Sequence, residues 1–351
     1  MKLIKIISIN FIVFLIGVFL LEFTIIQINK NKIKCSYVLC NYNITYKNKL
    51  YEPFGNIVYK KDKYGFRGRV KDISKIDILV FGGSTTDERY LNLNDTWTEQ
   101  LEQLLKKNIN NLDIVNAGID GQSTFGHIWN FKYWISKIDN FETKYVFFYI
   151  GINDSLKSGL FDMESTNYQA FSLKDKIKFN LKNNNAFIFG VYKSFLKLRI
   201  MLELDINPGH KKENINKNYY INDDKQNFEI DESFRLKYTQ NIKELTRLTK
   251  KIGAEPVFIT QRTLQWFKEE GKIYNYGGRD HYKYELFRRN IIMEHCNKND
   301  LFCIDVFNNL DLKNSDTYDL VHLTPSGSSK VAKIIEQEIL KNKDFLNKLK
   351  N

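Results

Sequence analysis

The segment IDILVFGGSTT, residues 76–86, predicts a buried β-strand that ends in a sharp glycine turn carrying a hydroxyl group. Gly82 and Gly83 allow a tight bend directly before Ser84. Such a turn can cradle a phosphate or hold a nucleophile. It lacks the G-K-[ST] ending of a P-loop, the G-x-G-x-x-G of a dinucleotide site and the G-x-S-x-G elbow of α/β-hydrolases. Taken alone, the stretch favours plain turn glycines and a serine helix cap.

Strand and helix patterns alternate on both sides of this turn and onward to the end of the chain. Further strands are expected at 112–118, 144–151, 254–260 and 301–306. Helices are expected at 94–107, 233–253 and 324–340, with Thr96 and Thr324 as caps. This alternation favours a three-layer α/β/α domain, in which helices cover both faces of a doubly wound parallel sheet.

The chain divides into three parts by composition. Residues 1–28 form an apolar start, 29–70 a polar connector, and 71–351 the α/β domain. Two stretches exceed the minimal strand–helix unit and are expected to be insertions, at about 155–232 and 261–289.

The apolar run from Ile6 to Ile28 predicts one transmembrane helix, because a spanning helix needs about 20 apolar residues. No small-residue cleavage site follows it, so we expect an uncleaved signal-anchor. A buried core helix is the alternative, disfavoured by the apolar character of every face. Lysines lie at both ends of the run, but long domains translocate regardless of such charges. We therefore expect a single-pass membrane protein with an extracytoplasmic domain.

The chain has four cysteines and no C-x-x-C pair. Cys35 with Cys40, and Cys296 with Cys303, are close enough in sequence to form disulfides in an oxidising compartment. Free buried thiols are the alternative for both pairs.

The composition argues against a nucleic-acid partner. The 351 residues carry a net charge of +12 and are 43% hydrophobic, enough for a sizeable core. The lysines are dispersed and not clustered with aromatic residues, as they are in a nucleic-acid groove. Four histidines have no carboxylate at ligand spacing, so neither a metal nor another cofactor is expected; they are His127, His210, His281 and His295. Nothing in the sequence indicates an oligomeric state.

Polar groups follow successive predicted strands, where ligands bind in an open parallel sheet. Ser84 follows the first strand, Gly121 the second and Asn153 the third, while Asp319 and His322 follow the fifth. Together they supply a hydroxyl, a flexible backbone N–H, an amide and a carboxylate–imidazole pair, which is the inventory of a serine hydrolase.

Each of these groups has a chemical reason to be present. A serine hydroxyl needs a base to take its proton, and histidine ordinarily titrates near neutral pH. Asp319, three residues before His322, can turn back and hold the ring in one tautomer. The backbone N–H groups of Ser84 and Gly121 and the side chain of Asn153 can donate to an oxyanion. Asn116, Gly118 and Asp154, which flank these groups, are expected to form turns or to accept hydrogen bonds.

Four blocks, FGGSTT, NAGIDG, GIND and DLVHLTPSG, occur in this order and together resemble the SGNH hydrolase superfamily, also called GDSL-like esterases. The resemblance covers about residues 76–340. It implies a five-stranded, flavodoxin-like sheet, with Ser84 as nucleophile, Gly121 and Asn153 as oxyanion donors, and His322 as a base oriented by Asp319.

One position departs from the family pattern. The first block commonly reads Gly-Asp-Ser, and Gly83 stands here in place of the aspartate. The anchor, the YGFRG segment and the Gly-Gly-Ser block together look like membrane-anchored members of the superfamily that act on envelope glycans.

The second insertion is rich in aromatic residues and follows a strand at the same edge. Trp266, Tyr274 and Tyr276 are candidates to stack on sugar faces, and Arg262 to contact an anionic group. An aromatic loop that packs on itself is the alternative.

The sequence therefore predicts a serine esterase that removes an acyl group, such as acetyl, from a carbohydrate or another small ester. Transfer of the acyl group to a second hydroxyl by the same triad is one alternative. A catalytically silent glycan-binding or assembly protein is another, disfavoured by the complete set of reactive groups.

Overall fold

The computed structural model describes residues 9–14, 16–18, 20, 23–24, 38–68, 70–154, 219–221, 232–276 and 280–350. The predicted parallel sheet is confirmed, with strand order β10-β7-β5-β3-β4. Its strands are β3 (Ile76–Gly82), β4 (Ile114–Asn116), β5 (Thr143–Tyr149), β7 (Glu255–Ile259) and β10 (Cys303–Ile304). In order of their appearance along the chain the strands lie 5-4-3-1-2, the flavodoxin-like arrangement, which changes direction between β3 and β5.

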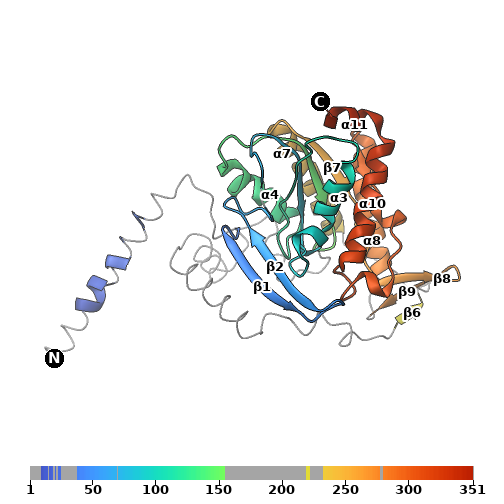
Figure 1. Cartoon of the computed structure of the whole chain (residues 1–351), viewed down its shortest axis with the longest axis horizontal. Coiled ribbons are helices and arrows are strands. Elements are labelled where there is room, and N and C mark those ends of the chain that lie inside the picture. The colour runs from blue at the N-terminus through green and yellow to red at the C-terminus, as the bar shows by residue number, and fades with distance from the viewer. Residues whose placement is uncertain are drawn as a thin grey trace.

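Helices cover both faces of this sheet, which makes the three layers visible in Figure 1. Ile78 and Val80 pack on one face, and Leu79 and Phe81 on the other, because successive strand residues point to opposite sides. The first face is covered by α3 (Trp97–Leu105), α10 (Pro325–Lys341) and α11 (Lys343–Lys350). The second is covered by α4 (Thr124–Tyr133), α7 (Glu232–Lys251) and α8 (His281–Lys298).

The helix ends follow the sequence signals. Thr96 accepts a hydrogen bond from the Glu99 N–H at the start of α3, and Thr324 caps α10, where Pro325 is the first residue. Gly253, with φ +80°, ends the turn after α7. The remaining short helices are α2 (Ser84–Asp87), η1 (Leu93–Asp95), η2 (Ile135–Lys137), α9 (Val306–Asn309) and η6 (Asn314–Asp316).

A β-hairpin lies within the predicted connector, residues 29–70, and packs against the α/β domain. Strands β1 (Tyr42–Asn48) and β2 (Gly55–Lys61) pair antiparallel (Figure 1). Arg67 follows the hairpin and joins it to the sheet, because its N–H donates to Asn116 O of β4 at 2.9 Å. The buried side chains of the hairpin include Tyr42 and Tyr59, which pack against residues near the nucleophile turn.

The two insertions together form a small antiparallel sheet. Its order is β6-β9-β8, from β6 (Tyr219–Ile221), β9 (Lys272–Tyr276) and β8 (Trp266–Glu269). The rest of the first insertion, predicted at about 155–232, lies almost entirely outside the described residues.

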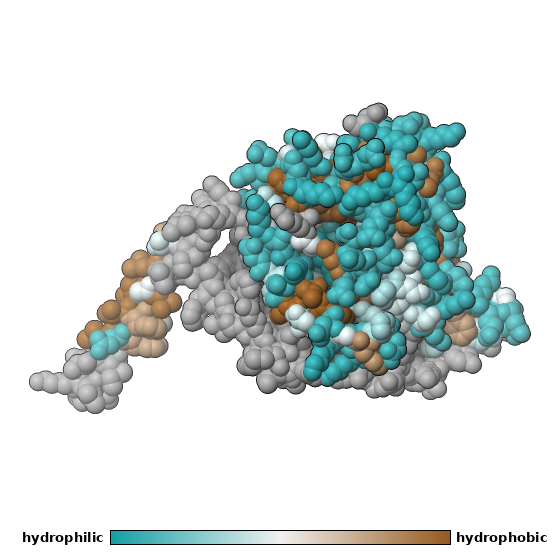
Figure 2. All heavy atoms as spheres, viewed as in Figure 1, coloured by the Kyte–Doolittle hydropathy of each residue, from teal (hydrophilic) through white to brown (hydrophobic). Residues whose placement is uncertain are grey.

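About half of the predicted transmembrane run, 6–28, lies outside the described residues. Those described between 9 and 24 are helical, and Phe11 and Phe14 expose 61% and 65% of their surface. Figure 2 shows this short stretch as a brown, apolar surface. Among the described residues, no helix is both long and apolar enough to span a bilayer.

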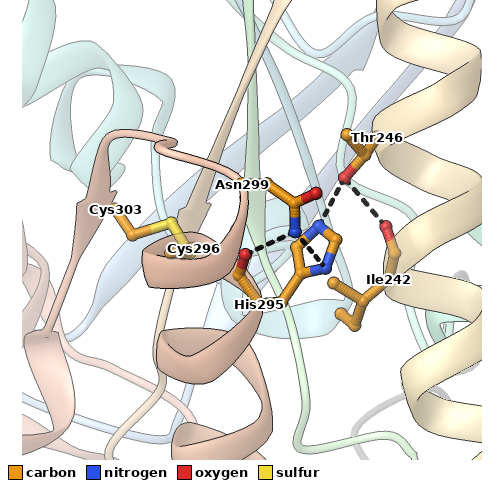
Figure 3. The surroundings of a disulfide bond; sticks show 6 residues. All are labelled: Ile242, Thr246, His295, Cys296, Asn299 and Cys303. Carbon is orange, nitrogen blue, oxygen red and sulfur yellow. Dashed lines mark hydrogen bonds between the residues drawn. A yellow bond between two sulfur atoms is a disulfide. The ribbon is translucent and has the colours of Figure 1, made fainter.

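A disulfide links the end of α8 to β10, between Cys296 and Cys303 (Figure 3). His295, beside it, is held by Thr246 Oγ1 at 2.9 Å from its Nε2 and by Asn299. Cys40 is also disulfide-bonded, and its predicted partner Cys35 lies outside the described residues.

Candidate active site

Ser84 is the first residue of α2 and follows β3 at the point where the strand order changes direction. The turn is too tight for larger residues. A Cβ on Gly82 would lie 2.1 Å from Thr86 Oγ1 and 2.9 Å from Tyr149 O of the neighbouring strand. Glycine therefore lets the chain reverse beside β5 and present the Ser84 hydroxyl at the carboxyl edge of the sheet.

His322 and Asp319 meet Ser84 in one hydrogen-bonded chain. His322 Nε2 lies 2.8 Å from Ser84 Oγ, and His322 Nδ1 lies 2.7 Å from Asp319 Oδ2. Asp319 Oδ1 accepts from the backbone N–H groups of Val321 and His322, at 2.7 and 2.6 Å. The Tyr318 ring stacks on the imidazole, with centroids 5.5 Å apart and an interplanar angle of 6°. A carboxylate acceptor at Nδ1 places the proton there, so Nε2 is left to accept the serine proton.

Asn153 and Gly121 border the same turn. Asn153 follows β5, and its Nδ2 donates to Gln122 O at 3.0 Å, which leaves a second N–H on that amide. A Cβ on Gly83 would lie 2.1 Å from Asn153 Nδ2 and 3.2 Å from Gln122 O. Asn153 therefore fills the space that a side chain at position 83 would need, which accounts for the glycine at this position. Gly121 adopts φ +73°, a conformation that favours glycine.

Residues flanking the motifs hold the turns in register. Asn116 Nδ2 donates to Thr86 O at 2.7 Å, and its Oδ1 accepts from the Gly118 N–H. Asp154 accepts from the backbone and hydroxyl of Thr124, at the start of α4. Asn116, Gly118 and Asp154 thus have the structural roles expected from the sequence.

Gln261 is a positioning residue that the motifs did not reveal. It follows β7, and its Nε2 donates to Thr85 Oγ1 at 2.9 Å while its Oε1 accepts from the Ile152 N–H at 2.7 Å. It therefore connects the nucleophile turn to the turn that carries Asn153. Its place directly after a strand at the catalytic edge was the available signal.

Asp87, at the end of α2, is the centre of a cluster of buried side chains that the sequence motifs also did not reveal. Lys61 Nζ lies 2.9 Å from Asp87 Oδ1 and donates to Gly118 O at 2.7 Å. The Tyr59 hydroxyl donates to Asp87, and an Arg67 nitrogen donates to the Asp87 backbone O. Burial on its own would raise the pKa of Asp87, but the neighbouring cations lower it below its ordinary value. Lys61 thus clamps the segment after the nucleophile to the segment before Gly121.

A family model of GDSL-like lipases and acylhydrolases matches residues 78–335. The chain belongs to the GDSL-like lipase/acylhydrolase family. It is an ester-hydrolysing enzyme. A search of curated proteins finds no match.

Solved structures of similar fold share little sequence with this GDSL-like enzyme. An acetyl xylan esterase variant from Geobacillus stearothermophilus is 14% identical, with TM-score 0.42, covering 75% of this chain and 94% of its own. A carbohydrate acetylesterase from Sinorhizobium meliloti is 12% identical, with TM-score 0.41 and coverage of 76% and 99%. A GDSL-like lipase from Bacteroides thetaiotaomicron is 13% identical, with TM-score 0.39 and coverage of 78% and 91%.

The structure does not support a substrate-facing role for Arg262 or Trp266. Both are buried, and the Arg262 guanidinium lies 3.3 Å from the centre of the Trp266 ring. Arg262 donates to the backbone O atoms of Thr263 and Trp266, while Trp266 Nε1 donates to Glu285 at 2.9 Å. Burial lowers the pKa of Arg262 to about 10. These side chains hold the insertion against the domain, which is the alternative of a self-packing loop.

The two tyrosines of the same prediction are half-buried on β9. Tyr274 stacks on Phe267, with centroids 5.0 Å apart, and Tyr276 packs against the same ring at 5.6 Å. Contact with a substrate stays a prediction for both.

The other described histidines are not part of the catalytic chain. His127 is fully buried, stacks on Phe81, and has its pKa lowered to about 3 by burial. His281 begins α8, and His210 lies outside the described residues. Within the described part of the chain, no three His, Cys, Asp or Glu side chains are grouped as metal ligands would be.

Replacement of Asn153 by alanine is expected to lower kcat by about 10²–10³, with little change in KM, because oxyanion donors act mostly in the transition state. Asn130→Ala is the matched control, since Asn130 pairs with the side chain of Gln122 in the same turn. The measurement is kcat and Tm on the same preparations. An Asn153→Ala enzyme with lowered Tm and full activity per folded molecule would limit Asn153 to tying down the turn.

Glu88 gives the fold an unusual pH dependence. Burial raises its pKa from 4.5 to about 8. Hydrogen bonds from Ser328 Oγ and the Trp97 N–H act in the opposite direction and lower the pKa, but burial has the larger effect. Because the folded state then holds a proton that the unfolded state releases, stability falls as pH rises between about 5 and 8. Relative to Glu88→Gln, the free energy of unfolding should fall by up to about 1.4 kcal/mol per pH unit in this window. Urea titrations at several pH values measure it, and parallel curves for both proteins would refute it.

Proposed function

We propose that this GDSL-like enzyme is a serine esterase that removes an acyl group, such as acetyl, from a carbohydrate through an acyl-enzyme on Ser84. The observation that carries the proposal is the hydrogen-bonded chain from Ser84 Oγ through His322 to Asp319, at 2.8 and 2.7 Å. Both distances are within hydrogen-bond reach. The first allows His322 to take the proton of the attacking hydroxyl, and the second allows Asp319 to hold the imidazole.

The geometry supports a two-step reaction. His322 Nε2 takes the Ser84 proton as Oγ attacks the ester carbonyl, and Asp319 stabilises the imidazolium. The N–H groups of Ser84, Gly121 and Asn153 stabilise the oxyanion. His322 then donates the proton to the departing sugar oxygen. A water molecule, deprotonated by His322, attacks the acyl-enzyme and releases the acid and the free Ser84 hydroxyl.

The carbohydrate substrate and the location of the enzyme are parts of the same proposal. The resemblance of the anchor, the YGFRG segment and the Gly-Gly-Ser block to membrane-anchored members supports an envelope glycan as the substrate. The exposed apolar side chains between residues 9 and 24 support a membrane anchor. The Cys296–Cys303 disulfide supports an extracytoplasmic domain, because disulfides persist in oxidising compartments.

Covalent labelling tests the nucleophile. A fluorophosphonate should label the wild-type enzyme on Ser84 and should not label Ser84→Ala, and unlabelled wild-type protein would contradict an active serine. A screen of acetylated glycans for released acetate then tests the substrate class. Including free sugars as acceptors distinguishes hydrolysis from acyl transfer, because transfer consumes ester without a matching release of acetate.

Protease accessibility tests the location. Protease added to intact cells or spheroplasts should digest the catalytic domain. Protection until lysis would place the domain in the cytoplasm.

A further inference from the structure

Arg89 lies close to the nucleophile in sequence, and among the described residues its guanidinium has no hydrogen-bond acceptor. It lies five residues after Ser84 and directly follows Glu88. The φ of +44° at Glu88 turns the chain out of α2. Its guanidinium is half-buried and lies 5.7 Å from the centre of the Tyr59 ring. Its Nε is shielded from solvent, and Arg89 forms no hydrogen bond or ion pair with any residue that the structure describes. A guanidinium has five N–H donors, so this one retains its capacity to bind an anion.

The other cations of this region are already engaged. Lys61 binds Asp87 and Gly118 O, and Arg67 donates to the backbone O atoms of Asp87 and Leu91. All three cations lower the pKa of the buried Asp87 carboxyl, whereas burial raises the pKa of Glu88 to about 8. The three cations outnumber the Asp87 carboxylate, and Arg89 is the one of the three that donates no hydrogen bond to a described residue.

The residue after Arg89 is connected to the catalytic histidine through one intervening aromatic ring. Tyr90, the residue after Arg89, packs edge-on against Tyr318 with centroids 6.2 Å apart, and Tyr318 stacks on His322. Asp120, exposed and adjacent to Gly121, is the acidic group on this side and forms no ion pair with Arg89. Burial would lower the pKa of Arg89, but Tyr59, Tyr46, Asp87 and Asp120 hold it well above its ordinary value, so the guanidinium stays charged.

We propose that Arg89 binds an anionic group on the substrate, a carboxylate or a phosphate carried by the sugar whose ester Ser84 cleaves. The proposal rests on the esterase function and narrows its substrates to acidic acylated sugars. A guanidinium fits both anions, because its parallel N–H groups can bind two oxygens at once. The anion would supply the acceptors that Arg89 lacks and offset the surplus positive charge of the cluster.

Matched substrates test the preference. Acetylated methyl galacturonoside and acetylated methyl galactoside differ in one carboxylate, and an acetylated sugar phosphate forms the third arm. Wild-type kcat/KM should favour an anionic ester by about tenfold or more, as expected for a hydrogen-bonded charge pair. The Arg89→Gln enzyme should lose this ratio. Arg247→Gln, which removes an exposed arginine of α7 paired with Glu244, should keep it. The anionic ester with the larger kcat/KM relative to the neutral ester shows whether Arg89 prefers a carboxylate or a phosphate.

Two results would overturn the proposal: a wild-type ratio near one, or equal loss of the ratio in Arg89→Gln and Arg247→Gln. Arg89→Lys retains the charge without the fork and should give an intermediate ratio, which keeps the test valid if the glutamine variant does not fold. Calorimetric binding of methyl galacturonoside and of a sugar phosphate to Ser84→Ala separates this proposal from the esterase function. Binding that Arg89→Gln abolishes would support the anion site even if neither ester were hydrolysed, and failure of both ligands to bind would count against it.

Discussion

Replacement of Ser84 by alanine is expected to lower kcat for an acetyl ester by about 10⁶-fold, because nucleophile and base act as one unit. His322→Ala should cost about as much, and the double variant should lose little more, since either single change already removes covalent catalysis. Steady-state hydrolysis of a chromogenic acetyl ester measures all three. The activity that remains should come from oxyanion stabilisation and substrate binding alone.

Ser74→Ala is the matched control for this prediction. The Ser74 hydroxyl lies on the exposed surface and donates a local hydrogen bond to Asp72 at 2.8 Å. That change should leave kcat unaltered, and Ser84→Ala should leave Tm nearly unaltered, because the Ser84 hydroxyl bonds to His322 at a half-buried position. A Ser84→Ala enzyme that retained more than about one hundredth of wild-type activity would place the nucleophile elsewhere.

The sheet and the catalytic chain were predictable because their signals are local. Each strand is a short apolar run, and each motif stands directly after such a run, as Ser84 does after β3 and Asn153 after β5. Parallel strands present their carboxyl ends at the same edge, so residues far apart in sequence are brought together by the topology alone. The spacing of Asp319 and His322 allows the carboxylate to reach back to the ring, and the structure contains this contact.

The hairpin was missed although Tyr42, Ile44 and Tyr46 alternate with polar residues, as expected for a half-buried strand. Strand β1 reads YNITYKN, in which four of the seven positions are polar, and a lysine such as Lys61 in β2 ordinarily indicates a solvated surface. Its burial depends on Asp87, which is distant in sequence and lies on a helix of only four residues. Non-local pairing of this kind leaves no periodic pattern in the sequence. Gln261 escaped notice for the same reason, because its partners belong to two other turns.

Contacts between distant residues also explain why Arg262 and Trp266 were wrongly predicted to face the substrate. Aromatic and cationic residues after a strand suggested a sugar-binding loop, but the fold turns them inward toward Glu285, which lies on α8. A buried carboxylate that accepts from Trp266 Nε1 and from Thr263 is a strong reason for the insertion to pack on the domain.

The hairpin and the residue that follows it also contribute contacts to the helix that carries the nucleophile. The family match begins at residue 78, whereas Tyr59, Lys61 and Arg67 precede it and contact Asp87. Asp87 is three residues after the nucleophile on the same short helix. We therefore expect the orientation of Ser84 to depend on residues outside the matched segment.

Asp319→Asn is expected to lower kcat by about 10⁴-fold while the fold is kept, because the amide disturbs the tautomer of His322. In the native enzyme Asp319 Oδ2 accepts from Nδ1, which leaves Nε2 free to accept the Ser84 proton. An amide N–H facing Nδ1 would instead place the ring proton on Nε2, where it blocks that transfer. The measurement is kcat together with the rate of fluorophosphonate labelling, and both should fall together.

Asp316→Asn is the matched control, in the same loop and with the same change of atoms. Asp316 is buried, and its carboxylate binds Lys330 at 2.7 Å and accepts from Ser326 and the Lys313 N–H. Burial would raise the pKa of Asp316, but these partners lower it, so the amide should destabilise the fold by removing a partly buried ion pair. Asp316→Asn should therefore lower Tm and keep kcat per folded molecule, whereas Asp319→Asn should lower kcat far more than Tm. If the two variants lost activity only in proportion to their loss of folded protein, Asp319 would be a loop-stabilising residue, and the orientation of His322 would have to come from the stacked Tyr318 ring.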